Sequence, residues 1–234
     1  MRKTLLALAT LATLIACNKN DETHNLTLTG NVEGFKQGKL YLQKIVDTTL
    51  VTIDSVIVDG DSKFERKFNI ESPELYFLNI ERHNSNNLDN MLAIFVEPGV
   101  ININTTLQNY YSNAKVTGSK NHDLFVEYRK LAEKYNFETN SIIAQKLLAS
   151  KENNPKKLDS LNNRAEKITM MKYLVYTNFA KNHGDKEIAP YVALAEIQDI
   201  NTKYLDTIAK ALTPEVIKSK YGKDFTQLLE SRKK

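Results

Sequence analysis

Residues 114–135, AKVTGSKNHDLFVEYRKLAEKY, contain the point at which one hydrophobic pattern replaces another. Before Gly118 the chain carries short segments of the kind that form strands, the last of them at 114–117. The apolar residues after Gly118 recur at helical spacing and would share one helix face: Leu124, Tyr128, Leu131 and Tyr135. Ser119 is a suitable N-cap for that helix. The stretch therefore predicts a β region followed by a helical region.

Upstream of Gly118, apolar and polar residues alternate in short runs that are separated by turn residues. Asp59-Gly60-Asp61 suits a hairpin connection, and Pro98-Gly99 suits a tight turn. The segments expected as strands are 26–32, 39–45, 50–58, 63–70, 75–81, 91–97, 100–105 and 114–117. Eight short strands with regular turns predict an antiparallel β-sandwich or barrel over residues 26–118.

Downstream, residues 119–234 are expected to be entirely helical, which makes the fold class α+β. Asn153-Asn154-Pro155 should separate two helices, because proline is favoured at the first helical position. The helix that starts at Pro155 should bury one stripe: Leu158, Leu161, Ala165, Ile168, Met171, Val175 and Phe179. Helices are expected from 119 to about 135, then over 140–151, 155–182, 187–198, 202–212, 214–220 and 225–229.

The start of the chain is typical of a bacterial lipoprotein precursor. Arg2 and Lys3 precede an apolar run that is too short to span a bilayer, which needs about 20 residues, and the run ends at Ala16-Cys17. Residues 1–17 are therefore expected to be a lipoprotein signal peptide. Cys17 would become the fatty-acylated (palmitate-type) first residue that binds the membrane. An ordinary signal peptide with an incidental cysteine is the alternative.

Residues 18–25 are polar and are expected to form a flexible tether. Asn18 is not the aspartate that commonly retains lipoproteins in the inner membrane, so the outer membrane is the favoured location within the cell envelope. The periplasmic face and the cell surface both stay open.

Charge and cysteine content exclude several classes of function. Removing Arg2 and Lys3 leaves 30 basic against 28 acidic residues, so the mature chain carries a net charge of +2. No strongly basic face is expected, and nucleic-acid binding would need one. Because Cys17 is the only cysteine, its acylation leaves no thiol for disulfides, thiolate nucleophiles or CxxC redox chemistry.

The β region resembles the lipoprotein domain known as domain of unknown function 4369 (DUF4369). Six elements match in order: Gly30-Asn31-Val32-Glu33-Gly34, Gly38-Lys39-Leu40-Tyr41-Leu42, Ile53-Asp54-Ser55-Val56 followed by Asp59-Gly60 and Phe64, Pro73-Glu74-Leu75-Tyr76, Phe95-Val96-Glu97-Pro98-Gly99, and Val116-Thr117-Gly118-Ser119.

In that family, the domain often precedes a helical linker and a thioredoxin-like (AhpC/TSA) domain. The helical half resembles the linker, but the thioredoxin-like domain and its CxxC motif are absent from this sequence. The resemblance therefore implies a fold and a location in the cell envelope. It implies neither a redox activity nor a catalytic residue for this chain.

No catalytic or metal constellation is evident in the sequence, and no cofactor is expected. The histidines, His24, His83, His122 and His183, lack metal-ligand spacing and are expected to be exposed. Asp54-Ser55 lacks a base and an oxyanion motif, so it should lie on the outer face of a strand. Glu97-Pro98-Gly99 is expected to fix a turn, with a ligand role for Glu97 as the alternative. Tyr173 and Tyr176, with Met170 and Met171, are expected to pack in the core.

These observations predict a non-catalytic envelope lipoprotein whose β domain acts as a binding or scaffold module and whose helices offer a surface to an envelope protein. The alternative is an accessory that works in trans with a thioredoxin-like system for thiol–disulfide exchange or peroxide reduction. That alternative rests only on the family resemblance.

Overall fold

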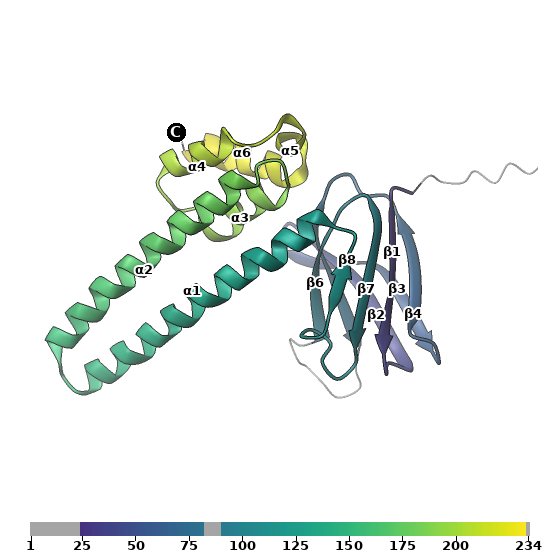
Figure 1. Cartoon of the computed structure of the whole chain (residues 1–234), viewed down its shortest axis with the longest axis horizontal. Helices are drawn as coiled ribbons and strands as arrows, with labels where there is room; N and C mark the ends of the chain where they lie inside the picture. Colours follow the sequence, from purple (N-terminus) through teal and green to yellow (C-terminus); the bar gives the residue numbers. More distant parts are fainter. Residues whose placement is uncertain (1–23, 82–89, 233–234) are drawn as a thin grey trace, which may run out of the picture.

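The computed structural model describes residues 24–81 and 90–232, and places strands in the first half of the chain and helices in the second (Figure 1). Residues 1–17 with Cys17, most of the tether, and His83 lie outside the described residues. The strands are β1 (Leu26–Glu33), β2 (Gln37–Val46), β3 (Thr49–Asp59), β4 (Lys63–Phe68), β5 (Glu74–Glu81), β6 (Met91–Val96), β7 (Gly99–Thr106) and β8 (Lys115–Thr117). All eight agree with the predicted segments to within two residues at either end.

The strands form two separate four-stranded sheets, β4-β1-β7-β8 and β3-β2-β5-β6. The structure is therefore a sandwich, and the alternative of a closed barrel is wrong. Most neighbouring strands are antiparallel, as expected. The exception is β1 with β7, which run parallel from the pair Leu26↔Gly99 to the pair Glu33↔Thr106.

The sandwich core follows the period-two pattern, since inward-facing residues of the strands meet between the sheets. On β1, Leu26, Leu28 and Val32 are buried, and their intervening neighbours face outward. Gly30 takes the fourth inward position. A Cβ at Gly30 would lie 2.5 Å from the Phe64 ring and 2.5 Å from the Ile103 carbonyl oxygen, so only glycine fits there.

The helices are α1 (Lys120–Lys151), α2 (Pro155–Asn182), α3 (Ile188–Glu196), α4 (Thr202–Ala209), α5 (Pro214–Lys218) and α6 (Lys220–Arg232). The prediction of a separate helix over 140–151 is wrong, because α1 is continuous. Its buried residues Tyr135, Ile142 and Ala149 keep a spacing of seven, so the face that packs on α2 is unbroken. The predicted start of α2 is confirmed: the Asn154 side chain accepts a hydrogen bond from the Lys157 amide at 3.1 Å.

Helices α1 and α2 form a long antiparallel hairpin that projects from the rest of the molecule, and α3 to α6 pack around its base (Figure 1). Of the stripe predicted for α2, Leu161, Ile168 and Phe179 are buried, but Met171 is 56% exposed. Met170, which was also expected in the core, is 64% exposed. The prediction that both methionines pack in the core is therefore wrong. No helix within the described residues is long and apolar enough to cross a membrane.

Candidate functional site

The sandwich meets the helices at a junction where Glu97 caps the start of α1. One Glu97 carboxylate oxygen accepts a hydrogen bond from the Lys120 amide at 2.7 Å. The other accepts from the Asn121 amide at 3.1 Å and from the Asn121 side chain at 2.8 Å. A carboxylate at this position satisfies free amides of the first turn and complements the helix dipole. The Glu97 side chain therefore fastens α1 to the sandwich.

Pro98 and Gly99 bring Glu97 to that position by turning the chain from β6 into β7. Gly99 has a φ of +131°, which favours glycine, and its amide donates to the Asn25 carbonyl oxygen at 2.8 Å. Glu97-Pro98-Gly99 therefore lies where the chain passes from one sheet to the other. Within the described residues, the partners of the Glu97 carboxylate belong to α1.

Asn121 and His122 extend the junction into the helical region. The Asn121 side chain also donates to Glu187 at 2.8 Å, and its oxygen accepts from the Ile188 amide at 2.9 Å, which ties α1 to α3. His122 is buried, and its Nδ1 accepts from the Phe95 amide at 3.2 Å. Burial lowers the pKa of His122 and outweighs the opposing effect of the Asp123 carboxylate. The prediction that this histidine is exposed is wrong.

Phe95 is the apolar centre of the junction. It lies on β6 and is fully buried, but its ring packs into the helical core and not between the sheets. The Phe95 ring centroid lies 5.8 Å from that of Tyr191, 5.9 Å from that of Tyr221 and 6.3 Å from that of Phe125. Such edge and tilted contacts add to the stabilisation from burial. One strand of the sandwich therefore completes the core of the helices.

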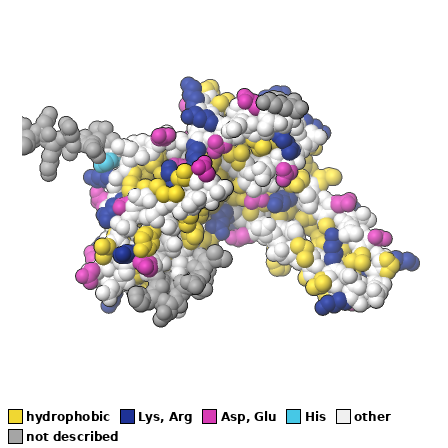
Figure 2. Space-filling model, turned by 180° about the vertical axis from the view of Figure 1, so that it is seen from behind, with side chains coloured by type: hydrophobic (Ala, Val, Ile, Leu, Met, Phe, Trp, Pro, Cys, Tyr) yellow, Lys and Arg dark blue, Asp and Glu magenta, His cyan; other side chains and the backbone are white. Residues whose placement is uncertain are grey.

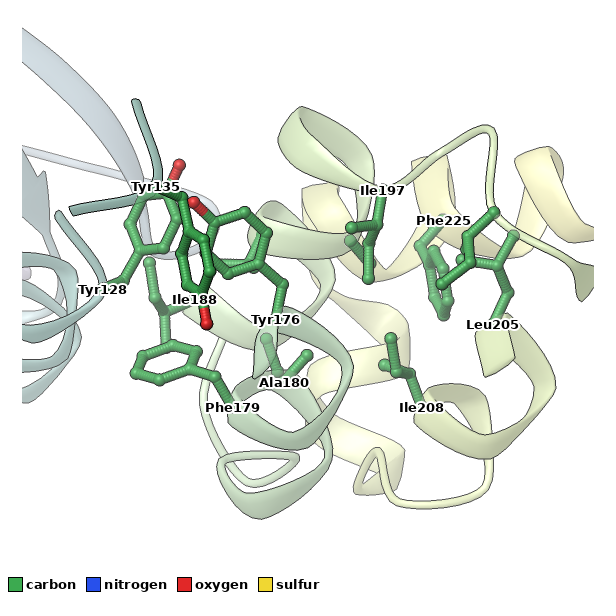
Figure 3. Close-up of a cluster of buried hydrophobic side chains, with 14 of the residues drawn as sticks. Tyr128, Tyr135, Tyr176, Phe179, Ala180, Ile188, Ile197, Leu205, Ile208 and Phe225 are labelled. Atoms are coloured by element: carbon green, nitrogen blue, oxygen red, sulfur yellow. The ribbon is translucent and has the colours of Figure 1, made fainter. Parts of the chain in front are cut away.

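Behind Phe95, the helical core is rich in tyrosine, and Figure 3 shows Tyr128, Tyr135 and Tyr176 beside Phe179. The Tyr128 hydroxyl donates to Glu196, whose carboxylate also pairs with Lys172 at 3.0 Å. Burial raises the pKa of Tyr128 and of Tyr176 far above the ordinary value, so both hydroxyls stay protonated. The Tyr176 hydroxyl is buried and has no hydrogen-bond partner within the described residues.

A second polar contact between the two regions centres on the buried carboxylate of Glu74. Lys44 of β2 and Lys220 of α6 each approach it at 2.7 Å. Burial alone would raise the pKa of Glu74, but the hydrogen bonds from Lys220 and Lys44 outweigh it, so the pKa lies below the ordinary value. The contact is reinforced where the Leu75 amide donates to the Tyr221 hydroxyl at 3.1 Å.

Glu74 lies in the wall of an open hollow of about 390 Å³ whose lining includes Lys44, Tyr76 and Lys220. The lining also includes Asp47 and Glu71, so its three carboxylates outnumber the two ammonium groups, and the hollow does not favour an anion. The residues of this lining include no histidine or cysteine, so they offer no nucleophile with an adjacent imidazole base. Sequence reasoning missed this cluster, because Glu74 and Lys220 lie 146 positions apart in the chain.

Another open hollow, of about 940 Å³, lies at the opposite end of the sandwich, where its lining includes Phe35, Gly38, Asp59 and Glu81. Its rim at Glu81 adjoins residues 82–89, which lie outside the described part of the chain. The lining is mixed, with apolar, acidic and basic side chains, and it brings together no recognisable set of catalytic groups.

The other residues considered as sites are dispersed. Asp54 forms an ion pair with Arg66 at 2.9 Å, which links the edge strands β3 and β4, and Ser55 is exposed on the strand. His24 is exposed, and the His183 ring makes a tilted contact with Phe179, with ring centroids 4.7 Å apart. Among residues 24–81 and 90–232, no three acidic, histidine or cysteine side chains gather in a way that could hold a metal ion. Tyr176 lies in the core, as predicted.

Comparison with known families agrees with this geometry. Residues 26–125 match the model of a family described as "Domain of unknown function (DUF4369)". Residues 26–125 are a DUF4369 domain. The match confirms the resemblance found in the sequence. It also extends past β8 into the first turns of α1, so the DUF4369 domain includes Glu97, Phe95 and the helix start that they hold.

The rest of α1 and all later helices lie outside the DUF4369 match. No curated protein and no solved structure matches the chain.

Proposed function

We propose that this chain is a lipid-anchored lipoprotein of the cell envelope, and that its folded part is a non-catalytic binding or scaffold module. The observation that carries the proposal is the α1–α2 hairpin, which is held at its base by several contacts and carries a group of exposed apolar side chains on the outer part of α1. The sequence around Cys17 supports the anchor, and the DUF4369 domain supports a module without a known reaction.

The base of the hairpin is held by several independent contacts. Glu97 caps α1, the Asn121 side chain bonds to α3, and Phe95 fills the space between the sandwich and the helices. Buried polar groups with complete hydrogen bonding restrict the relative motion of the parts that they join. A hairpin fixed in this way suits a scaffold, because its outer part keeps a constant position relative to the sandwich.

The outer part of α1 carries an apolar surface that we call the arm patch. Its residues are Phe137, Ile143, Leu147 and Leu148, which are 78%, 59%, 59% and 55% exposed. The α1 residues that face α2 are different ones, so these side chains are not needed for the contact between the two helices. Figure 2 shows apolar side chains along the projecting hairpin. Contiguous exposed apolar surface commonly marks a site of protein interaction.

The anchor is tested by fractionating membranes from cells that produce the native chain or Cys17→Ala. We expect the native chain in the membrane fraction, with an N-terminal peptide whose mass includes fatty acyl groups on Cys17. The Cys17→Ala chain should keep its uncleaved leader or leave the membrane. A native chain that is soluble and carries an unmodified Cys17 thiol would contradict the proposed anchor.

The partner surface is tested by placing a photoreactive residue at Phe137 in the anchored chain and irradiating intact envelopes. Val100, which is 64% exposed on β7, is the matched control position. We expect a discrete cross-linked protein from Phe137 and none from Val100. Equal products from both positions would contradict a specific arm patch. Recovery of a thioredoxin-like protein from Phe137 would favour the alternative role as an accessory to thiol–disulfide or peroxide chemistry.

The absence of catalysis is also part of the proposal. The supporting observation is that the described residues around the hollows show no nucleophile with an oriented base. Turnover of any substrate by the purified chain in a broad hydrolase screen, with loss of turnover in a single-residue variant, would overturn this part.

A further inference from the structure

The hairpin of β2 and β3 extends past the main body of its sheet. The ladder between the two strands has a bulge at Leu42/Gln43, and beyond it the chain continues through the pairs Gln43↔Thr52 to Val46↔Thr49. Only the first part of this extension, up to Lys44, is still paired with β5. We call residues 45–53 the hairpin tip. Its large apolar side chains are all more than one third exposed: Ile45 45%, Val46 42%, Leu50 39%, Val51 37% and Ile53 41%.

The hairpin tip is apolar on both of its faces. Ile45 lies directly opposite Leu50 on one face, and the positions next to them in each strand, Val46 and Val51, point to the other face. A hairpin that rests on a protein surface hides one face and leaves the other to water, so it usually alternates apolar with polar residues. Apolar residues on both faces instead suit a surrounding medium that is itself apolar.

The hairpin tip lies at the end of the sandwich from which the N-terminal segment departs. Asn25 is fixed at that end, because its side chain donates to the Ile70 carbonyl at 2.7 Å and accepts from the Ile70 amide at 2.9 Å. Val46 and Ile70 line the same hollow, so the hairpin tip lies at the same end of the sandwich as Asn25. The eight residue-to-residue steps from Cys17 to Asn25 can span at most about 29 Å. An acylated Cys17 therefore keeps this end of the sandwich close to the bilayer.

We infer that the hairpin tip is a second membrane contact, which enters the interfacial layer of the bilayer that holds the acylated cysteine. This inference rests on the proposed lipid anchor and adds an orientation to it. The tip should stay in the interface, because the unpaired backbone groups of an edge strand cannot be satisfied in hydrocarbon. The hairpin would lie obliquely in the interface, so that Asp47 and Thr48 at the turn stay among headgroups while the neighbouring apolar side chains reach the upper acyl chains.

The chain contains no tryptophan, so a single introduced tryptophan reports on one position. The test uses the full acylated chain as Leu50→Trp or Ile57→Trp, reconstituted on phosphatidylcholine–phosphatidylglycerol vesicles with brominated acyl chains, which quench nearby tryptophan. Ile57 is the matched control, since it lies on the same strand and is 73% exposed. It is about 23 Å from Leu50 along β3. Circular dichroism confirms that both variants fold.

We expect a blue-shifted emission for Leu50→Trp and bromine quenching at least about twofold stronger than for Ile57→Trp, as for side chains that enter the acyl boundary. If both variants sediment with vesicles but are quenched equally, the anchor stands and this inference is wrong. If neither variant sediments, the anchor fails and the inference fails with it. Emission from Leu50→Trp that is already blue-shifted without vesicles, and is not quenched by bromine, would mean that a second copy covers the tip, which also overturns the inference.

Discussion

The sandwich and the helical region bury their apolar residues in different ways. The sandwich core is largely aliphatic and is drawn from the strands of the sandwich and the loops between them. The helical core is rich in aromatic rings and includes Phe95 from β6 among its fully buried members. The difference teaches that the sandwich is complete in itself, whereas the helices use the sandwich as one wall of their core. Loss of the junction should therefore affect the helices more than the sheets.

The largest effect is expected from Phe95→Ala. Removing a buried ring should reduce the free energy of unfolding by about 3–5 kcal/mol, through lost burial and the cavity left behind. Amide hydrogen exchange should accelerate mainly in α3 and α6. Ile94→Ala is the matched control, because Ile94 is fully buried in the sandwich core next to Phe95 in sequence. It should accelerate exchange in β5 and β6 instead. The same exchange pattern in both variants would contradict the comparison.

Glu74→Gln should reduce the free energy of unfolding by about 1–3 kcal/mol, because it leaves Lys44 and Lys220 without their buried counter-charge but still partly hydrated. The pKa of Glu74 lies below its ordinary value of 4.5, so the unfolded chain binds this proton more tightly than the folded chain. The contribution of the Glu74 carboxylate to the free energy of unfolding is therefore complete above pH 4.5 and is lost as the pH falls below that value. Denaturant unfolding of both chains from pH 7 to pH 3 should show the difference shrinking in acid.

Glu97→Ala should cost about 1–2 kcal/mol, as the loss of a side-chain cap at a helix start usually does. Glu97→Gln keeps one of the two oxygen acceptors and removes the charge, so it should cost less than Glu97→Ala. Exchange of the Lys120 and Asn121 amides would locate the effect. Equal stability of Glu97→Ala and the native chain would show that the cap does not hold α1.

His122 should make the junction sensitive to acid. Burial lowers the pKa of His122 below the ordinary 6.5, so on acidification the unfolded chain binds a proton at His122 before the folded chain does. In the folded chain, protonation of Nδ1 would displace the Phe95 amide. The stabilisation of the fold by neutral His122 is present above pH 6.5 and is lost as the pH falls below that value. Between pH 7 and pH 5, the native chain should lose more stability than His122→Gln. Parallel curves for the two chains would refute this.

The smallest effect is expected in the arm patch. Phe137→Ser should change the free energy of unfolding by less than about 0.5 kcal/mol, because an exposed side chain has little burial to lose. Ile142→Ala, one turn away and buried, should cost about 2–4 kcal/mol. A costly Phe137→Ser would mean that the arm patch is covered within the isolated molecule.

Much of the fold could be predicted from local patterns. The alternation at Leu26 and Leu28 predicts β1, and Asn154 with Pro155 predicts the start of α2. Both signals are local, because a strand period and a helix cap involve only neighbouring residues. The division of α1 into two helices was wrong because polar residues near Asn140 obscured the continuous spacing of Tyr135, Ile142 and Ala149.

The junction could not be predicted. Ile94, Phe95 and Val96 are all buried, and a run that is buried on both faces does not reveal which side chain faces which core. The prediction that Met171 is buried is wrong because its side chain lies outside the contact between α2 and α1, as its exposure shows. The contact of Glu74 with Lys220 joins residues far apart in the chain, so only the folded arrangement reveals it. The lipid anchor at Cys17 stays a prediction.

The parallel pairing of β1 with β7 has a consequence for the order in which the molecule assembles. β1 is the first strand to be synthesised, but it lies inside its sheet between β4 and β7, and Leu26 meets Gly99 only after 72 intervening residues. Contacts of such long sequence separation form late and slow folding, because the loop between them must be closed first. While the chain is still emerging, Leu26 and Leu28 therefore lack their final neighbours, and the nascent strand needs protection from aggregation until β7 arrives.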